Sequence, residues 1–493
     1  MIFRSLFLFE VLRLLRSPIP WGAAAICLGL RLVATWQWLP DMSVDPTSTS
    51  GAMLLLAVAM MLTANLATSR DMRGGMPETL GALSGRATER TKAATSAAVT
   101  VGAGIALPVM AVYLLARLAM GPVAGVFDPC EALGGVLAVP FAAALGAMLG
   151  RWAPWLVAVP VMAFLIGAFT WLNSQQSGYG DWFLPVVLYH GPDWPQRPSA
   201  LHAVYLLASV ALFAALALLR HGPRPVRLVA ALAAAALAVP TGAAATTAAP
   251  GEEINHRFEI MQRDPAALLD DMDVQVRERY FARDARRCEK HGTITYCAFH
   301  DYAAWIPSWV SAVNPVAQAL PPAQRDRLPA VRQFTDSWLG ADDDEATSIR
   351  TYMMWGRAGA EDAYRAVLAS QLIRSVLGLR PPMAGCDAHG QSRALVGLWL
   401  LGQVIALTPP EDREIQIGSS TFSSVQSPLG MVRYGAAELG YARRLLATPD
   451  ARQRIWTHWD TLLKPGTTVE QALPLLGLRP EFPAEPVKGQ PCS

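Results

Sequence analysis

The sequence predicts an all-α polytopic membrane protein of seven spans, followed by a mainly α-helical, disulfide-containing extracellular domain. Hydrophobic residues make up 52% of the 493 residues, and the mean hydropathy of +0.27 is high for so long a chain. Charged residues are scarce before about Pro250 and common after it, and four of the six cysteines lie in this second part. A net charge of +2, with no basic run interleaved with aromatics, argues against nucleic acid as a partner.

The first 17 residues do not form a convincing signal peptide, because charges interrupt the apolar part and no small-residue cleavage site follows. These charges are Arg4, Glu10, Arg13 and Arg16. The helical spacing of the apolar residues predicts an amphipathic interfacial helix over 1–17, lying on the inner membrane surface. A cytosolic extension of the first span is the alternative.

Seven stretches hold the roughly 20 apolar residues that a helix needs to cross a bilayer. They are residues 19–39, 51–69, 94–117, 131–150, 154–172, 200–219 and 227–247. The first six belong to a membrane domain over 18–220. The seventh, within 221–249, is rich in alanine and only weakly hydrophobic.

Lysine and arginine in the short loops favour a cytoplasmic N-terminus. On that side the segments between spans hold Arg70, Arg73, Arg86, Arg90, Lys92, Arg151, Arg220, Arg224 and Arg227. The opposite side offers Arg117, at a helix end, and Arg197. An odd number of spans then places residues 250–493 outside the cell. The seventh span also fits an internal signal sequence, because small residues at A-x-A spacing follow its apolar run, and cleavage there would release the outer domain.

A charged strip, residues 69–95, separates the second and third predicted spans. Pro77 and Glu78 suit the first turn of a short helix, and Leu80 and Leu83 give that helix an apolar edge. A solvated loop whose arginines only enforce topology is the simpler interpretation. The length of the strip and its mixture of both charge signs with an apolar edge favour a docking element.

Within this strip, "RDMRGGMPETLGALSGRATERT" resembles the segment between the second and third spans of type-2 ABC transporter permeases. In that family the segment is a coupling helix that sits in a cleft of the ATP-binding subunit. The order of elements is similar too: a surface helix, six spans, and short re-entrant outer helices before the sixth span, here within 173–199. The resemblance covers about the first 220 residues. The segment "YCAFHDYAAWIPSW" is similar to one in the outer domains of actinobacterial ABC permeases.

The resemblance implies a plasma-membrane permease subunit of an ABC exporter for a hydrophobic or amphipathic substrate. Such a subunit pairs with a second permease copy or a sister permease. No G-x-x-x-x-G-K-[ST] loop occurs in the chain, so we expect no cofactor here, with ATP and Mg held by a separate ATP-binding subunit. The implied ATPase-coupling residues are Arg70, Asp71, Arg73, Glu78, Thr79, Leu80, Leu83 and Arg86. The added seventh span and outer domain depart from the usual permease.

Two other functions remain open at this point. The chain could be a non-transporting sensor or assembly protein whose outer domain binds a ligand. It could also be a membrane-tethered hydrolase, although neither H-E-x-x-H nor G-x-S-x-G is present. Asp387, His389 and Ser392 lie close in sequence, but we expect no catalytic triad there and no metal site.

Three polar residues in or beside the spans are candidates for the translocation path: Arg31, Asn65 and Glu131. Arg31 either snorkels to the outer headgroups or faces the path, with Glu131 or Asp128 as a possible partner. Asn65 is interpreted first as a helix-packing residue.

The cysteines of the outer domain predict two disulfides. Cys288 and Cys297 would close a hairpin around "GTITYCAF", the main strand signal in a domain whose other segments show helical spacing. Zinc binding by these two cysteines with His291 and His300 is the alternative. Cys386 and Cys492 would then pair and hold the C-terminal tail.

Overall fold

The computed structural model describes residues 2–73, 87–155, 157–175, 184–186, 199–245, 259–260, 274–335, 348–357, 359–379, 385–417, 420–483 and 490–492. The chain divides into two compact units, an N-terminal unit Met1–Phe281 and a C-terminal unit Ala282–Ser493.

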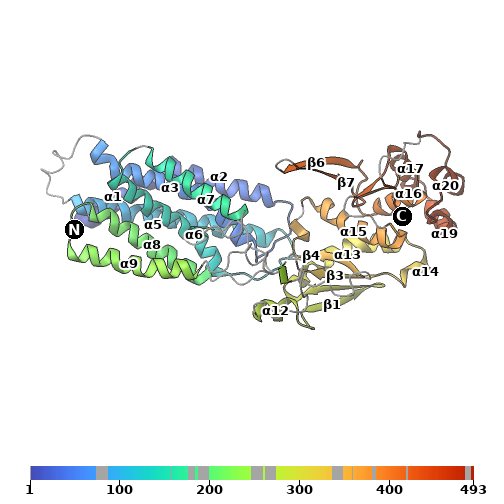
Figure 1. Cartoon of the computed structure of the whole chain (residues 1–493), viewed down its shortest axis with the longest axis horizontal. Coiled ribbons are helices and arrows are strands. Elements are labelled where there is room, and N and C mark those ends of the chain that lie inside the picture. Colours follow the sequence, from blue (N-terminus) through green and yellow to red (C-terminus); the bar gives the residue numbers. More distant parts are fainter. Residues whose placement is uncertain are drawn as a thin grey trace. The chain divides into compact units, whose positions relative to one another are not determined.

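The N-terminal unit is a helical bundle with no strand among its described residues (Figure 1). Its helices are α1 (Ile2–Leu15), α2 (Pro18–Thr35), α3 (Asp45–Arg73), α5 (Ala87–Ala119), α6 (Pro129–Trp152), α7 (Ala158–Gln175), α8 (Ser199–Leu219), α9 (Pro225–Ala244) and α12 (Val274–Tyr280). The seven predicted spans all form helices, α2 to α9. Six of the described helices are long and apolar enough to cross a membrane, and α7 is a shorter apolar helix. The chain is therefore a helical membrane protein.

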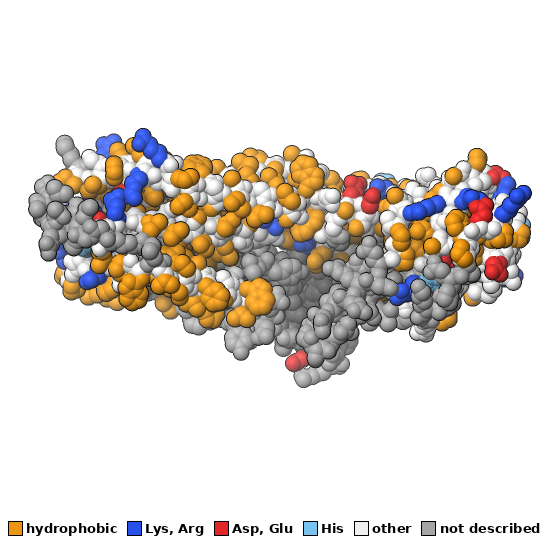
Figure 2. All heavy atoms as spheres, turned by 90° about the horizontal axis from the view of Figure 1, so that it is seen from above, with side chains coloured by type: hydrophobic (Ala, Val, Ile, Leu, Met, Phe, Trp, Pro, Cys, Tyr) orange, Lys and Arg blue, Asp and Glu red, His pale blue; other side chains and the backbone are white. Residues whose placement is uncertain are grey.

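The side chains of these helices explain why a bilayer suits them. Large apolar residues of α2, α7 and α9 remain exposed, for example Val33 (79%), Phe164 (72%) and Val226 (80%). Figure 2 shows such apolar side chains spread along the bundle surface. Exposed apolar area of this extent is unfavourable in water and favourable in lipid.

The helix α1 differs from the amphipathic helix that the sequence predicts. Its buried side carries the charged Glu10 beside Leu14, whereas Leu8, Phe9 and Leu12 on the other side are about half exposed. The reason is that Glu10 is paired with Arg70 of the neighbouring helix α3, so this carboxylate faces the bundle and apolar groups face outward.

The centre of the bundle is the contact between α3 and α6, where glycines replace side chains. A Cβ added at Gly146 would lie 2.1 Å from the backbone oxygen of Met61, and one at Gly150 would lie 2.2 Å from Thr68 Oγ1. The Thr68 hydroxyl also reaches the Ala147 carbonyl of α6 at 3.3 Å. Small residues four apart allow two helix backbones to approach closely, and dispersion and weak polar contacts then hold them together.

The C-terminal unit is a mixed α/β fold, so the prediction of a mainly helical domain missed its sheet. Four strands, β1 (Arg286–His291), β2 (Ile294–Phe299), β3 (Ala330–Phe334) and β4 (Ser348–Tyr352), pair in the order β1-β2-β3-β4. The first pair is antiparallel and the other two pairs are parallel. Two smaller sheets join β5 (Cys386–Asp387) with β8 (Val432–Arg433), and β6 (Glu411–Ile417) with β7 (Ser420–Gln426).

The helices of the C-terminal unit cover an aromatic core. They are α13 (Ile306–Ala319), α14 (Pro322–Arg325), α15 (Glu361–Leu377), α16 (Ser392–Leu401), α17 (Ala436–Leu446), α18 (Ala451–Thr457), α19 (Trp459–Leu462) and α20 (Val469–Leu475). Trp305 and Trp309 are fully buried, and both lie edge-on or tilted against the ring of Trp355.

Both predicted disulfides are present. Cys288 and Cys297 face each other across the β1–β2 hairpin, which turns at Gly292, and the bond between them excludes the zinc alternative. Cys386 pairs with Cys492, and the Cys492 amide donates to the Asp387 carbonyl at 2.9 Å. This bond attaches the C-terminal segment to β5. The remaining cysteines of the chain, Cys27 and Cys130, are free.

Candidate functional site

The candidate site lies where the charged strip leaves the bundle. Its two roots are the last turn of α3, around Arg70 and Asp71, and the first turns of α5, around Arg90. Of the predicted coupling residues, Arg70 and Asp71 are described with their side chains, and Arg73 ends α3. Glu78, Thr79, Leu80, Leu83 and Arg86 lie outside the described residues, as do most of 173–199.

Asp71 joins both roots of the strip to the central helix α6. Its Oδ2 lies 3.8 Å from Arg90 Nε on α5 and 3.7 Å from Arg151 Nη2 on α6. The three side chains are 7 to 21% exposed, so water screens the attraction only in part. One carboxylate shared by two guanidinium groups leaves a positive excess at this point.

Glu10 connects the α3 root to α1. One of its oxygens accepts from Arg70 Nη2 at 3.0 Å, and the other accepts from Arg13 Nη1 at 3.3 Å. Its side chain is 9% exposed. This contact is why the Glu10 carboxylate faces the bundle, whereas the arginines of α1 are exposed.

The α5 root also contacts the connection between α8 and α9. Thr91 Oγ1 lies 2.7 Å from His221 Nε2, and Arg227 Nη2 donates to Thr88 Oγ1 at 3.1 Å. Burial, together with the nearby positive charges of Arg151, Arg227, Arg220 and Arg90, lowers the pKa of His221 to about 4. His221 is therefore neutral at pH 7, and it can exchange a hydrogen bond with a hydroxyl without adding to the positive charge.

The contacts above place the basic residues of many helices at one end of the bundle. Figure 2 shows lysine and arginine side chains gathered there. The opposite end of the α2, α3 and α5 helices carries Arg31 and Arg117. The helix α8 starts at the end of the bundle opposite the strip, where Ser199 Oγ donates to Asp128 Oδ2 at 2.6 Å. It ends at the basic end, where His221 contacts Thr91. The next helix, α9, therefore runs away from the strip.

At that opposite end, Arg117 is a buried cation whose structural role the sequence analysis did not predict. Its side chain is 0% exposed, and Nε donates to Asp45 Oδ2 at 2.9 Å. Its other nitrogens donate to the carbonyls of Thr35, Trp38 and Leu39 at 2.9 to 3.0 Å. Arg117 thus caps the C-terminal end of α2 and fixes it to the start of α3. The available signal was an acidic residue and an arginine at the same predicted end of adjacent spans.

Arg31 joins this network instead of the acidic partners proposed for it. Its Nη2 donates to the Tyr113 hydroxyl at 3.3 Å, and its guanidinium lies 5.5 Å from the centre of that ring. Asp128, one of the two alternatives for an acidic partner of Arg31, instead caps α6 and accepts from Ser199 Oγ.

Asn65 is buried at the α3–α6 contact, where its backbone lies against Gly150. This position agrees with a packing role.

In the C-terminal unit, Asp387 and His389 are in contact, but Ser392 is not part of a triad with them. Asp387 Oδ1 accepts from the His389 amide at 2.9 Å and contacts its Nδ1, whereas Ser392 Oγ donates to the Leu462 carbonyl at 2.5 Å. Glu438 accepts from the amides of Gly390 and Gly435 at 2.7 and 2.8 Å. These groups hold the loop after β5 against α17. Among the described residues, no group of three potential metal ligands is found.

No protein-family model, curated protein or solved structure matches this chain.

Proposed function

We propose that the chain is the membrane-spanning permease subunit of an ABC exporter, with the charged strip as the element that docks into a separate ATP-binding subunit. The observation that carries the proposal is that ion pairs connect the strip roots to the other helices of the bundle. Asp71 ties α3 to α5 and α6, and Glu10 ties the same root to α1. A displacement of the strip would therefore move several helices together.

The charge distribution supports a cytoplasmic position for the strip. Lysine and arginine gather at the strip end, and by the positive-inside rule such an end would face the cytoplasm. With all seven apolar helices crossing, the C-terminal unit would lie on the outer side, where its two disulfides would be stable. The substrate would be hydrophobic or amphipathic, and a second permease copy or a sister permease would complete the pathway.

In this mechanism, the ATP and Mg belong to the partner subunit. Closure of the ATP-binding subunits would push on Glu78 and Leu80 of the strip. The push would reach α3 through Arg70 and Asp71 and reach α5 through Arg90. The bundle helices would then shift relative to one another and release cargo outward.

The test is co-purification of the tagged full chain in mild detergent from its native host, with and without Glu78→Arg. We expect an ATP-binding subunit to co-purify with the natural protein and to fall at least tenfold with the variant. The matched control is Glu470→Arg, an equal charge reversal at an exposed position of the C-terminal unit, which should retain the partner. Absence of any ATPase with the natural protein would refute the proposal. Equal retention by both variants would refute the docking role of the strip.

A further inference from the structure

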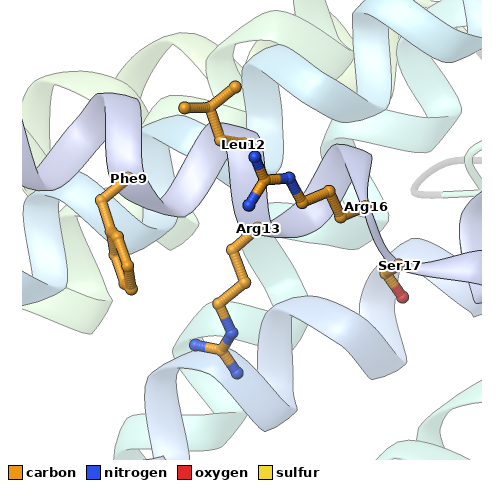
Figure 3. Close-up of a pocket in the computed structure, with 5 residues that line it drawn as sticks. All are labelled: Phe9, Leu12, Arg13, Arg16 and Ser17. Atoms are coloured by element: carbon orange, nitrogen blue, oxygen red, sulfur yellow. The ribbon is translucent and has the colours of Figure 1, made fainter.

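The outer side of α1 holds a pocket that is separate from the strip roots. It has a volume of about 290 Å³ and is lined by Phe9, Leu12, Arg13, Arg16 and Ser17. Figure 3 shows the side chain of Arg16 reaching toward Leu12, the side chain of Arg13 extending away from Leu12, and Phe9 about one turn away along α1. Two cations and two large apolar side chains therefore share one small surface.

The positive charge of this pocket is incompletely neutralised. Arg13 shares Glu10 with Arg70, so one carboxylate serves two guanidinium groups. Arg16 is exposed and forms no side-chain hydrogen bond or ion pair within the described part of the chain. Guanidinium groups bind phosphate oxygens in a bidentate manner, so an anion with several oxygens suits this pair.

The apolar residues around the pocket indicate where such an anion comes from. Phe9 and Leu12 are 58% and 53% exposed, and Ile19 and Trp21 after them are 42% and 48% exposed. Trp21 Nε1 donates to the last-turn carbonyl of α1 at Leu15, at 2.8 Å, which keeps the indole beside the end of that helix. Since the membrane helix α2 begins at Pro18, these side chains lie at the boundary between lipid and water.

We propose that this pocket binds the phosphate headgroup of an anionic membrane phospholipid, through Arg13 and Arg16, while Phe9 and Leu12 contact its glycerol and upper acyl region. The inference rests on the membrane position of α2 and not on the proposed transport function. A lipid bound here would hold α1 on the membrane surface. Because Glu10 of α1 bonds Arg70, it would also hold the α3 root of the strip.

The test uses the full chain in a neutral detergent at low salt, with lipid binding measured by native mass spectrometry. The probes are phosphatidylglycerol, phosphatidylcholine and inorganic phosphate. Each basic residue near a membrane surface contributes about 1 kcal/mol, so the double variant Arg13→Gln/Arg16→Gln should bind phosphatidylglycerol about 30-fold more weakly. Arg4→Gln is the matched control, because Arg4 is exposed on the same helix and does not line the pocket.

Each outcome decides the proposal. The proposal is supported if the double variant loses phosphatidylglycerol binding while the natural protein and Arg4→Gln retain it, and if all three proteins bind phosphatidylcholine and phosphate weakly. Equal retention of phosphatidylglycerol by the double variant overturns it, and inorganic phosphate binding as tightly as the lipid overturns the lipid source. If the double variant does not fold, the natural protein still decides, because binding that is unchanged between 0.05 and about 0.5 M salt excludes an ionic headgroup site. A dimer that Leu12→Arg dissociates without changing lipid binding would assign the face to a second copy and overturn the proposal.

Discussion

Replacing Arg117 by methionine should destabilise the bundle strongly. The substitution keeps most of the apolar stem and removes the guanidinium, which leaves the carboxylate of Asp45 buried without its cation. It also removes the arginine donor from the carbonyls of Trp38 and Leu39, and from the Thr35 carbonyl, which keeps the Trp38 amide. Loss of one partner from a buried ion pair costs about 3 to 5 kcal/mol, and we expect the free energy of unfolding to fall by that amount.

A double-mutant cycle separates the ion pair from the carbonyl contacts. The variant Arg117→Met/Asp45→Asn removes both charges, so its cost should be below the sum of the two single costs by about 2 kcal/mol. The control is Arg31→Met, which removes one hydrogen bond, to the Tyr113 hydroxyl at 3.3 Å, and the contact of the guanidinium with that ring. That change should cost about 1 kcal/mol.

The assay is native-state labelling of the Cys27 thiol in the full chain, in detergent. Cys27 is a free cysteine of α2 and is 1% exposed, so a thiol reagent reaches it only when the bundle opens. Cys130→Ser in all samples removes the other free thiol. Single substitutions at Arg117 and Asp45 that cost less than about 1 kcal/mol, or that are additive within error, would refute the reasoning.

Three further predictions concern other parts of the chain. Gly146→Ala should lower the free energy of unfolding by about 1 to 3 kcal/mol in the same labelling assay, because the added Cβ meets the α3 backbone. The control Gly104→Ala adds its Cβ to open space and should leave the free energy of unfolding unchanged or raise it. The folded-state pKa of His221 is about 4, below its ordinary value of 6.5. The contribution of neutral His221 to stability is therefore complete above pH 6.5 and declines as the pH falls toward 4. The thermal midpoint of His221→Gln, measured over the same pH range, should lack this decline. Cys386→Ala opens a loop of 106 residues and Cys288→Ala one of 9, so the first should reduce stability by about 2 kcal/mol more, measured by denaturant unfolding of the full chain.

The positions of the membrane helices could be predicted because they depend on local composition. About 20 consecutive apolar residues are enough to identify a span, and α3, α5, α6 and α8 contain the stretches expected for them. The disulfides could be predicted because four cysteines in one unit, two of them in a hairpin pattern, leave few pairings.

The sheet and the buried ion pair could not be predicted in the same way. The strands β3 and β4 are only five residues long and show no regular alternation of apolar and polar side chains. They pair in parallel, so their partners are separated from them in sequence by intervening segments. Arg117 and Asp45 are 72 residues apart, and only the packing of α3 against α5 brings them together. Both features depend on non-local contacts, about which local periodicity carries no information.

The two ends of the bundle differ in how firmly α3 and α5 are joined. At the Arg117 end, the ion pair is 2.9 Å long and fully buried, and the loops beside it are linked by the Met42 amide, which donates to Ala124 at 2.7 Å. At the strip end, Asp71 lies 3.7 to 3.8 Å from its two cations and remains partly exposed. Buried, well-formed pairs resist separation more than long, partly solvated ones. Helices α3 and α5 should therefore separate more easily at the strip end, with the Arg117 end as the pivot, and a force applied to the strip would act at the end that moves most.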